Sequence, residues 1–266
     1  DQDHDMDLVL STEWGPLTAY FNEGGVFRKK ELSAEKGWWQ FVQALDLDQD
    51  GDMDLVAGNL GCNSRLQATS DHPVRLYYND FDGNGKKEQI LTYYLQGKEI
   101  VFANKEELQK QLPGLKKKFL YAADFARASL RDLFDPSLLK KAKVWEADYF
   151  KSVVMVNNGS GQFTVNPLPW PAQLSPLKAI IPLQLNGDQR VDFIALGNDY
   201  GANIQMGRYD ADFGSVLINE GKGKFSTGAP LGIKGEIRRV KGIRVGAREF
   251  YILARNNDSL LLIDVQ

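Results

Sequence analysis

The sequence contains little of what catalytic and disulfide-bonded sites usually require. One of its 266 residues is a cysteine, so no internal disulfide can form, and two are histidines. Cys62, His4 and His72 stand outside any recognisable nucleophile motif, and neither an HExxH motif nor a phosphate-binding glycine motif occurs. The sequence alone therefore indicates no reaction.

Long apolar runs and a strong net charge are also missing. No apolar run approaches the roughly 20 residues that span a bilayer, which argues against a transmembrane segment. The formal net charge of −3 is too small, and the acidic residues are too locally clustered, to favour nucleic acid as a partner. The composition, 43% hydrophobic and 25% charged, is ordinary for a globular chain of this length.

Aspartate, by contrast, is crowded into the stretch ALDLDQDGDMDLVAG at residues 44–58. Its aspartates are Asp46, Asp48, Asp50, Asp52 and Asp54, and Gly51 occupies the sixth position counted from Asp46. Carboxylates this close repel one another unless a cation neutralises them, and a central glycine lets a tight loop wrap oxygens around a hard metal ion. The stretch predicts a calcium site with Asp52 contributing its backbone carbonyl.

The same pattern can be read in three further places. The N-terminal DQDHDMDLVL supplies Asp1, Asp3, Asp5 and Asp7, and NDFDGNGKKEQIL supplies Asp80, Asp82, Asn84 and Glu88. A degraded copy, LQLNGDQRVDFIAL, keeps Asn186, Asp188 and Asp192 but has Gln184 first and Gln189 where glycine is expected. We expect Ca2+ in the loops at Asp46 and Asp80 and none in the loop at Gln184.

An EF-hand would explain the first six positions of the loop but not the rest. That motif needs a bidentate glutamate at position twelve and a helix on each side. Position twelve is Ala57 counted from Asp46 and Leu91 counted from Asp80. The flanking runs are short and β-type, so the ninth residue (Asp54, Glu88 or Asp192) is expected to complete the metal shell and open the next strand.

A second element recurs as an apolar run followed by asparagine, glycines and phenylalanine. It reads YFNEGGVF, VVMVNNGSGQF and VLINEGKGKF, beginning its turns at Asn22, Asn157 and Asn219. Asparagine and glycine tolerate the positive φ of tight turns, so each copy predicts a β-hairpin. Internal repeats of one such unit favour a solenoid or a propeller.

These two motifs together make the chain resemble the FG-GAP or VCBS repeat family, whose best-known relative is the integrin α-chain head. The resemblance spans roughly residues 1–102 and 152–230. It implies an all-β fold, a β-propeller of four-stranded blades with calcium loops between the first two strands on one face of the disc. Function follows only weakly, since propellers host lyases, adhesins and scaffolds alike.

The segment from about 104 to 150 has a different texture, rich in leucine, lysine, glutamate and alanine. Asn104 with Glu107, and Asp135 before Pro136, predict helix starts. We expect two or three short helices here, broken at Pro113-Gly114, inserted into one propeller domain over residues 1–266. The remainder leaves room for four to five blades of roughly 45–50 residues, as part of a larger ring that begins upstream.

A third recurrent pattern places Gly-Asn directly behind a strand, in GNLGCNSRL and GNDYGANIQMGRY. With a C-terminal segment, it gives a candidate ligand face opposite the calcium loops: Asn59, Asn63, Arg65, Asn198, Asn203, Arg208 and Arg255. Asparagine and arginine could hydrogen-bond a glycan or a carboxylate there. The alternative is that these residues only satisfy turn geometry.

Two classes of function follow from these observations. The favoured one is a calcium-stabilised propeller that binds a protein or glycan as an adhesion or scaffold module. Weak carboxylate sites suit millimolar calcium, so we expect an extracellular, periplasmic or cell-surface location, with membrane attachment through an upstream part of the chain. The alternative is part of a calcium-dependent carbohydrate-active enzyme such as a polysaccharide lyase.

Overall fold

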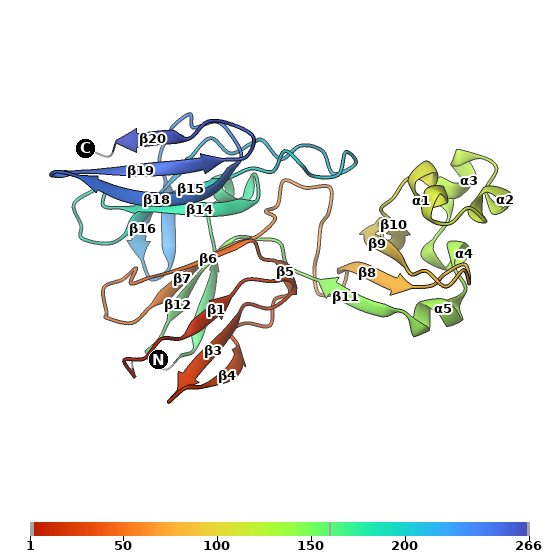
Figure 1. The fold of residues 1–266 in the computed structure, drawn as a ribbon, viewed down its shortest axis with the longest axis horizontal. Coiled ribbons are helices and arrows are strands. Elements are labelled where there is room, and N and C mark those ends of the chain that lie inside the picture. The colour runs from red at the N-terminus through yellow and green to blue at the C-terminus, as the bar shows by residue number, and fades with distance from the viewer. Residues whose placement is uncertain (1–2, 160, 265–266) are drawn as a thin grey trace. The chain divides into compact units, whose positions relative to one another are not determined.

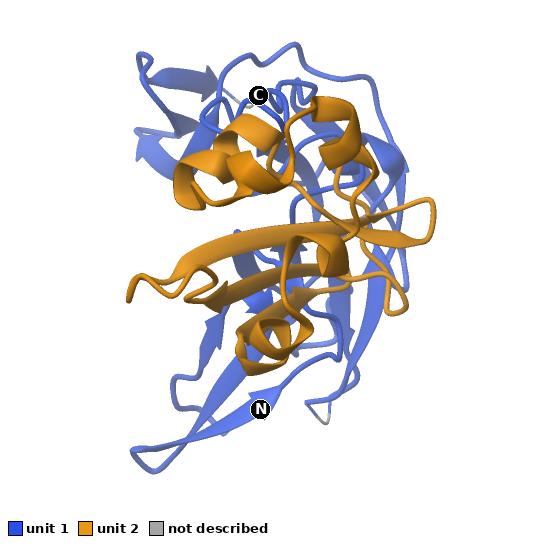
Figure 2. Cartoon of the chain, turned by 90° about the vertical axis from the view of Figure 1, so that its right-hand side faces the viewer, with its two compact units in different colours: residues 1–64, 150–266 blue, residues 65–149 orange. Residues whose placement is uncertain are grey.

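The computed structural model describes residues 3–159 and 161–264, and strands make up most of its regular structure (Figure 1). The all-β class is confirmed. The chain divides into two compact units, residues 1–64 with 150–266, and residues 65–149 (Figure 2). We call them the sheet unit and the inserted unit. None of the described helices is long and apolar enough to cross a membrane.

The sheet unit contains two four-stranded antiparallel sheets. Within each sheet, every strand pairs with the strand of that sheet that follows it in sequence. The first is formed by β6 (Phe41–Leu45), β7 (Asp54–Gly58), β12 (Val153–Asn157) and β13 (Phe163–Pro167). The second is formed by β14 (Leu177–Leu183), β15 (Asp192–Gly197), β16 (Ser215–Gly221) and β17 (Lys224–Thr227). Ala57 lies opposite Val153, so β7 and β12 pair although the whole inserted unit lies between them in sequence.

Smaller sheets complete the unit. One contains β1 (Leu8–Leu10), β3 (Thr18–Glu23) and β4 (Val26–Glu31), and another contains β18 (Ile237–Val245), β19 (Arg248–Arg255) and β20 (Leu261–Asp264). β2 (Glu13–Gly15) pairs with β5 (Gly37–Trp38), and a 3-10 turn covers Trp170–Gln173. The sheets do not close into a ring within the described residues, and the expected propeller with its four to five blades stays a proposal.

The apolar core of the sheet unit explains why its sheets stack. β7 and β15 are buried along their whole length. Val56, Val154 and Phe193 bring the two four-stranded sheets together in one cluster. On the other face of the second sheet, Ile194 packs in a cluster with Tyr251 from β19. The second sheet is therefore buried on both faces, between the first sheet and the sheet of β18–β20.

The inserted unit has a different topology. Its strands are β8 (Val74–Asn79), β9 (Glu88–Leu95), β10 (Lys98–Val101) and β11 (Lys143–Ala147), in the order β10-β9-β8-β11. Its last strand thus returns beside the first, the 4-1-2-3 order of a Greek key, whereas the four-stranded sheets of the sheet unit are simple meanders. The third aspartate loop, which the sequence assigns to a propeller blade, lies between β8 and β9 of this unit.

Five short helices connect β10 to β11. They are α1 (Lys105–Gln111), α2 (Leu115–Lys118), α3 (Ala122–Arg127), α4 (Leu130–Leu133) and α5 (Pro136–Lys141). The Asn104 side chain accepts the Glu107 N–H at 2.9 Å, and Asp135 accepts the Ser137 N–H at 2.7 Å, as the sequence predicts. The helices number more than the two or three expected, and the end of the expected helical segment forms β11 instead.

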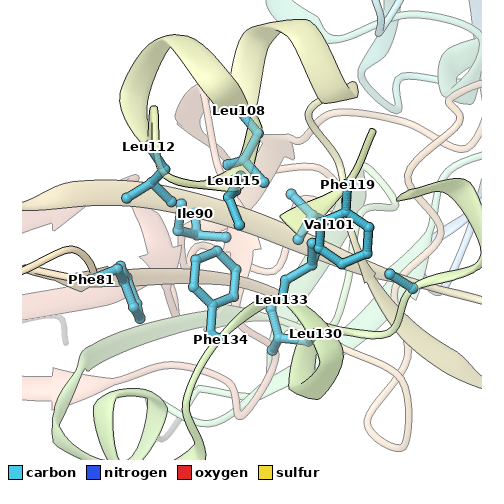
Figure 3. Close-up of a cluster of buried hydrophobic side chains, with 11 residues drawn as sticks. Phe81, Ile90, Val101, Leu108, Leu112, Leu115, Phe119, Leu130, Leu133 and Phe134 are labelled. Carbon is cyan, nitrogen blue, oxygen red and sulfur yellow. The ribbon is translucent and has the colours of Figure 1, made fainter. Parts of the chain in front are cut away.

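The helices are held on one face of the sheet by a core of the unit's own side chains. Leu108 and Leu115 from the helices surround Ile90 and Val101 from the sheet (Figure 3). Phe81, in the aspartate loop, packs on Phe134 with ring centroids 4.7 Å apart. The break between α1 and α2 falls at Pro113-Gly114, where it is expected.

Candidate functional site

The loop between β6 and β7 gathers three carboxylates. One carboxylate oxygen from each of Asp46, Asp48 and Asp50 lies within 4.8 Å of the others. Within the described residues, Asp46 Oδ1 and Asp52 Oδ1 are buried and have no hydrogen-bond partner. A buried, unpaired carboxylate oxygen is unfavourable unless a cation reaches it. The donor set therefore fits a hard, oxygen-seeking ion such as Ca2+.

Asp54, at the ninth position, has a structural role in this loop. Its side chain is fully buried, Oδ1 accepts the Asn157 N–H at 2.8 Å, and Oδ2 accepts the Leu47 N–H at 3.0 Å. Burial raises the pKa of the Asp54 carboxyl to about 6, although these two N–H groups oppose the shift. Asp54 Oδ2 thus holds the start of the loop and Oδ1 ties it to β12, while the expected place of Asp54 in the metal shell stays a prediction.

Two other loops of the sheet unit repeat this arrangement. Asp7 Oδ1 accepts the Asn22 N–H, and Asp192 Oδ1 accepts the Asn219 N–H, each at 2.8 Å. Asp192 Oδ2 also accepts the Leu185 N–H at 2.8 Å, as Asp54 does for Leu47. In all three sheets, an aspartate at the start of one strand or directly before it is thus tied to the hairpin asparagine of the neighbouring strand.

The first loop is described in part. Asp1 lies outside the described residues. Asp3 Oδ1 accepts the Asp5 N–H at 3.0 Å. His4 stands at the expected glycine position and has φ 71°.

The third loop, in the inserted unit, has a second carboxylate cluster. Oxygens of Asp80, Asp82 and Glu88 lie within 4.8 Å of one another. Asp80 accepts the N–H groups of Gly83 and Gly85 at 2.7 and 2.8 Å, and hydrogen bonding from Gly85 in particular lowers its pKa. Glu88 accepts the Phe81 N–H at 2.8 Å, the bond that Asp54 makes with Leu47. The expected ligand Asn84 accepts the Lys86 N–H.

The fourth loop, between β14 and β15, differs because it contains its own cation. Arg190 Nη1 lies 3.1 Å from Asp188 Oδ2 and donates to the Asn219 carbonyl at 3.2 Å. Asn186 Nδ2 donates to the same Asp188 oxygen. Gln189 adopts φ 71°, the conformation that the sequence assigns to glycine at this position. The guanidinium of Arg190 thus pairs with the Asp188 carboxylate, which stands at a ligand position of the expected calcium pattern.

The recurrent Gly-Asn pairs lie at the opposite end of the strands from these loops. A Cβ on Gly58 would lie 2.0 Å from the Leu177 carbonyl oxygen, and one on Gly197 would lie 1.8 Å from that of Pro176. Each glycine therefore permits a close backbone approach that no other residue allows.

The two asparagines that follow these glycines are buried. Asn59 Oδ1 accepts the Trp38 N–H at 2.9 Å, and Asn198 Nδ2 donates to the Asp212 and Gly235 carbonyls at 2.9 Å each. Both were candidates for ligand contact, but the structure places them as anchors of the turn. This corresponds to the turn-geometry alternative at these two positions.

The other candidate ligand residues of the sheet unit are more exposed, and each has a local partner of its own. Asn63 donates to the Leu174 carbonyl at 3.2 Å, and Asn203 Oδ1 accepts the Gln205 N–H at 2.8 Å. Arg208 stacks over Tyr200, 3.8 Å from its ring centroid. Arg255 is held by Ser259 at 2.8 Å and by Asp258 at 2.9 Å.

Arg65 belongs to the inserted unit. Its Nη2 donates to the Tyr93 hydroxyl at 2.7 Å, and its guanidinium carbon lies 5.0 Å from the centroid of the Phe102 ring.

The sequence reasoning missed a buried charge network at the same end of the sheet unit. The Lys178 ammonium lies 3.0 Å from Asp199 Oδ2 and 3.4 Å from Glu236 Oε1, and Arg238 also pairs with Glu236. The Glu236 side chain is fully buried. Lys178 inside the otherwise apolar strand LKAIIPL could have indicated this network, because a lone charge in a buried strand needs a partner of opposite charge.

Comparison with known proteins supports the resemblance for the N-terminal part of the chain. The model of the FG-GAP-like repeat matches residues 1–57, which include the first two aspartate loops. No curated protein matches the sequence. The chain therefore carries an FG-GAP-like repeat over residues 1–57, as the spacing of its aspartates predicts.

Proposed function

We propose that this protein is a calcium-stabilised binding module that holds a protein or glycan partner at the end of the sheets opposite the calcium loops. The FG-GAP-like repeat suggests a propeller-like binding or adhesion module. Calcium would be held by Asp46, Asp48 and Asp50, where it would neutralise three clustered carboxylates and stiffen the turn between β6 and β7.

The observation that carries the binding proposal is the connection from Asn198 to Gly214. Its base is fixed by the Asn198 hydrogen bonds and by a bridge in which Asp199 and Tyr209 exchange N–H···O bonds of 2.8 and 3.0 Å. Its tip is exposed, with Ile204 at 87%, and Arg208 stacks on Tyr200. Arginine, tyrosine and an exposed aliphatic side chain on a rigid base are typical of recognition loops.

Calcium contributes to binding indirectly in this proposal. Calcium would fix the turn between β6 and β7, and Val56 of β7 packs in one cluster with Phe193 of β15. The Asn198–Gly214 connection leaves the far end of β15. Millimolar affinity of such sites favours export to a calcium-rich compartment or the cell surface. Partner binding should therefore weaken in chelator without any calcium contact to the partner.

The experiment that tests the proposal is capture of partners on a glycan array and from cell-surface protein fractions, with calcium and with chelator. Arg208→Ala should lose most of the captured signal while its melting temperature stays unchanged. Lys224→Ala, an exposed charge on β17 next to the hairpin at the calcium end, is the matched control and should bind like the parent. Equal capture by both variants would place the binding surface elsewhere.

The lyase alternative is tested separately. Incubation with acidic polysaccharides should yield no unsaturated products if the protein only binds. Product formation would replace the binding proposal with an enzymatic one.

A further inference from the structure

A polar cavity opens between one edge strand from each of four sheets in the sheet unit. It measures about 460 Å³ and is lined by residues of β1, β6, β14 and β18, with Ser11 and Gln40 beside them. A second cavity of about 390 Å³ shares Gln40, Lys178 and Arg239 with it and adds Arg238. We call the two together the axial cavity. Its volume is within the range of small-molecule sites.

The charged groups that line the axial cavity are all cationic. Lys178, Arg238 and Arg239 contribute to its wall, and the amides of Gln40 and Gln43 are the uncharged polar groups beside them. Among the residues that the structure describes, no aspartate or glutamate lines either part. The cavity therefore presents hydrogen-bond donors and positive charge to whatever enters it.

Carboxylates behind the wall hold two of these cations in place. Glu236 Oε1 accepts hydrogen bonds from the Lys178 ammonium and the Arg238 guanidinium. Glu236 Oε2 accepts the Tyr200 N–H at 3.2 Å and an amide N–H of Asn256 at 3.0 Å. Asp199 takes the other contact of Lys178 at 3.0 Å. Two acids thus balance Lys178 and Arg238, and no ion pair is found for Arg239 among the described residues.

From this arrangement we propose that the axial cavity binds an oxyanion, a carboxylate, sulfate or phosphate, carried by a hydroxylated small molecule or by a side group of the partner. Arg239 would supply the uncompensated charge, and Lys178 would add a fixed donor deeper in the wall. Gln40, Gln43 and Ser11 would hydrogen-bond neighbouring hydroxyl groups. Charge-assisted bonds to a guanidinium are stronger than neutral ones, so Arg239 should dominate the affinity.

The position of the cavity connects it with the proposed binding end. Lys178 stands at the start of β14, Arg238 and Arg239 at the start of β18, and Gln40 just before β6. These ends of β6 and β14 lie opposite the aspartate loops that follow the same strands. The inference rests on the proposed binding function, because it names the ligand chemistry at the end of the sheets where the partner is proposed to bind. The residues of the axial cavity are different from those of the Asn198–Gly214 connection.

The test is calorimetric titration of the full chain, in calcium, with D-glucuronate, inorganic sulfate and inorganic phosphate, and with D-glucose as the neutral control. At least one anion should bind saturably and glucose should not. Affinity should fall as salt is raised from about 50 to about 300 mM, because screening weakens an exposed charge contact. The anion that binds best identifies which of the three groups the site prefers.

Two arginines of the same strand provide the matched variants. Arg239→Gln should weaken anion binding about tenfold or more, the loss expected for one charge-assisted contact. Arg244→Gln removes the same charge from an exposed position on β18 that does not line the cavity, and should bind like the parent. Both side chains are exposed, so both variants are expected to fold with unchanged melting temperatures.

The outcomes separate this inference from the proposed function. Equal weakening by both variants, binding of glucose as strong as that of glucuronate, or no saturable anion binding would each overturn the axial site. None of these would affect partner capture that depends on Arg208. Conversely, anion binding that depends on Arg239 supports the axial site even where Arg208→Ala leaves partner capture intact.

Discussion

At the scale of single residues, the aspartates of one loop divide into two kinds. Asp46, Asp48 and Asp50 gather oxygens with few protein donors, whereas Asp54 is buried and accepts two backbone N–H groups. The sequence places Asp54 in the metal shell beside Asp46, Asp48 and Asp50, because spacing alone does not reveal which oxygen meets an N–H from a strand about a hundred residues away. The clustering of Asp46, Asp48 and Asp50 could be predicted from the sequence, and the tie of Asp54 to Asn157 could not.

The two kinds of aspartate should respond differently to calcium. Asp50→Ala should lower the free energy of unfolding only when calcium is present, by about 2–3 kcal/mol at roughly 100 times the dissociation constant. Asp54→Ala should lower it by about 2–4 kcal/mol in chelator as well, because two buried N–H groups lose their acceptor. Urea unfolding in calcium and in EGTA measures both. Equal losses for Asp50→Ala in the two conditions would remove the metal assignment.

The raised pKa of Asp212 should make the protein less stable as the pH rises, whereas the lowered pKa of a salt-bridged acid has the opposite effect. Its carboxyl is buried at the turn before β16, and burial raises its pKa to about 6 although Gly197, Gly214 and Ser215 donate to it. A folded-state pKa above the unfolded value stabilises the protein below pH 4, and this contribution is lost as the pH rises through about 6.

The matching variant is Asp212→Asn, which cannot ionise. Its destabilisation relative to the parent should be largest near pH 4 and should shrink by up to about 3 kcal/mol by pH 7, since each pKa unit corresponds to about 1.4 kcal/mol. Unfolding of both proteins in the same buffers from pH 4 to 7 gives the difference directly. A pH-independent difference would show that Asp212 titrates near its ordinary pKa.

At the scale of elements, local signals were reliable and long-range pairings were not. The Asn104 cap, the break at Pro113-Gly114 and the three hairpins depend on neighbouring residues, so the sequence specifies them. The return of β11 beside β8 depends on helices that fold back over the sheet, and no local pattern encodes it. For that reason the sequence does not show that the loop at Asp80 belongs to a separate compact unit, where the structure places it.

The aspartate loops also differ from one another in a way that predicts metal stoichiometry. The loops at Asp46 and Asp80 have carboxylate clusters, while Arg190 pairs with Asp188 in the loop at Gln184. Terbium luminescence should therefore report a site in each of these two loops. Asp48→Ala should remove the first site and Asp82→Ala the second, and Asp188→Ala should leave the luminescence unchanged. Loss of a terbium site in Asp188→Ala would show that Arg190 does not replace the metal.

At the scale of the whole molecule, the inserted unit enters the first four-stranded sheet between its second and third strands. The chain leaves and returns at neighbouring points, because the Gly61 N–H donates to the Phe150 carbonyl at 2.8 Å. The second sheet has the connection Asn198–Gly214 at the equivalent place. The same position in two sheets thus carries the Asn198–Gly214 connection in one and a separately cored unit in the other.

Removal of the inserted unit should therefore leave the sheet unit folded. In the deletion variant, residues 65–149 are replaced by a short glycine-serine linker from Ser64 to Phe150, and β7 still pairs with β12 because Ala57 and Val153 remain opposite each other. Circular dichroism should show a β-rich protein with a calcium-dependent melting temperature from the loop at Asp46. A shorter connection also lowers the entropy lost on closing this loop, so stability in chelator should not fall.

The complementary fragment, residues 65–149 alone, should fold around the core of Ile90, Leu108 and Leu115 and should keep the terbium site that depends on Asp82. Leu108→Ala in this fragment removes a fully buried side chain and should cost about 2–5 kcal/mol. The two fragments together then account for every metal site of the full chain. If the deletion variant aggregates or loses its calcium response while the fragment folds, the sheet of β6, β7, β12 and β13 depends on the inserted unit, and the two units are one cooperative structure.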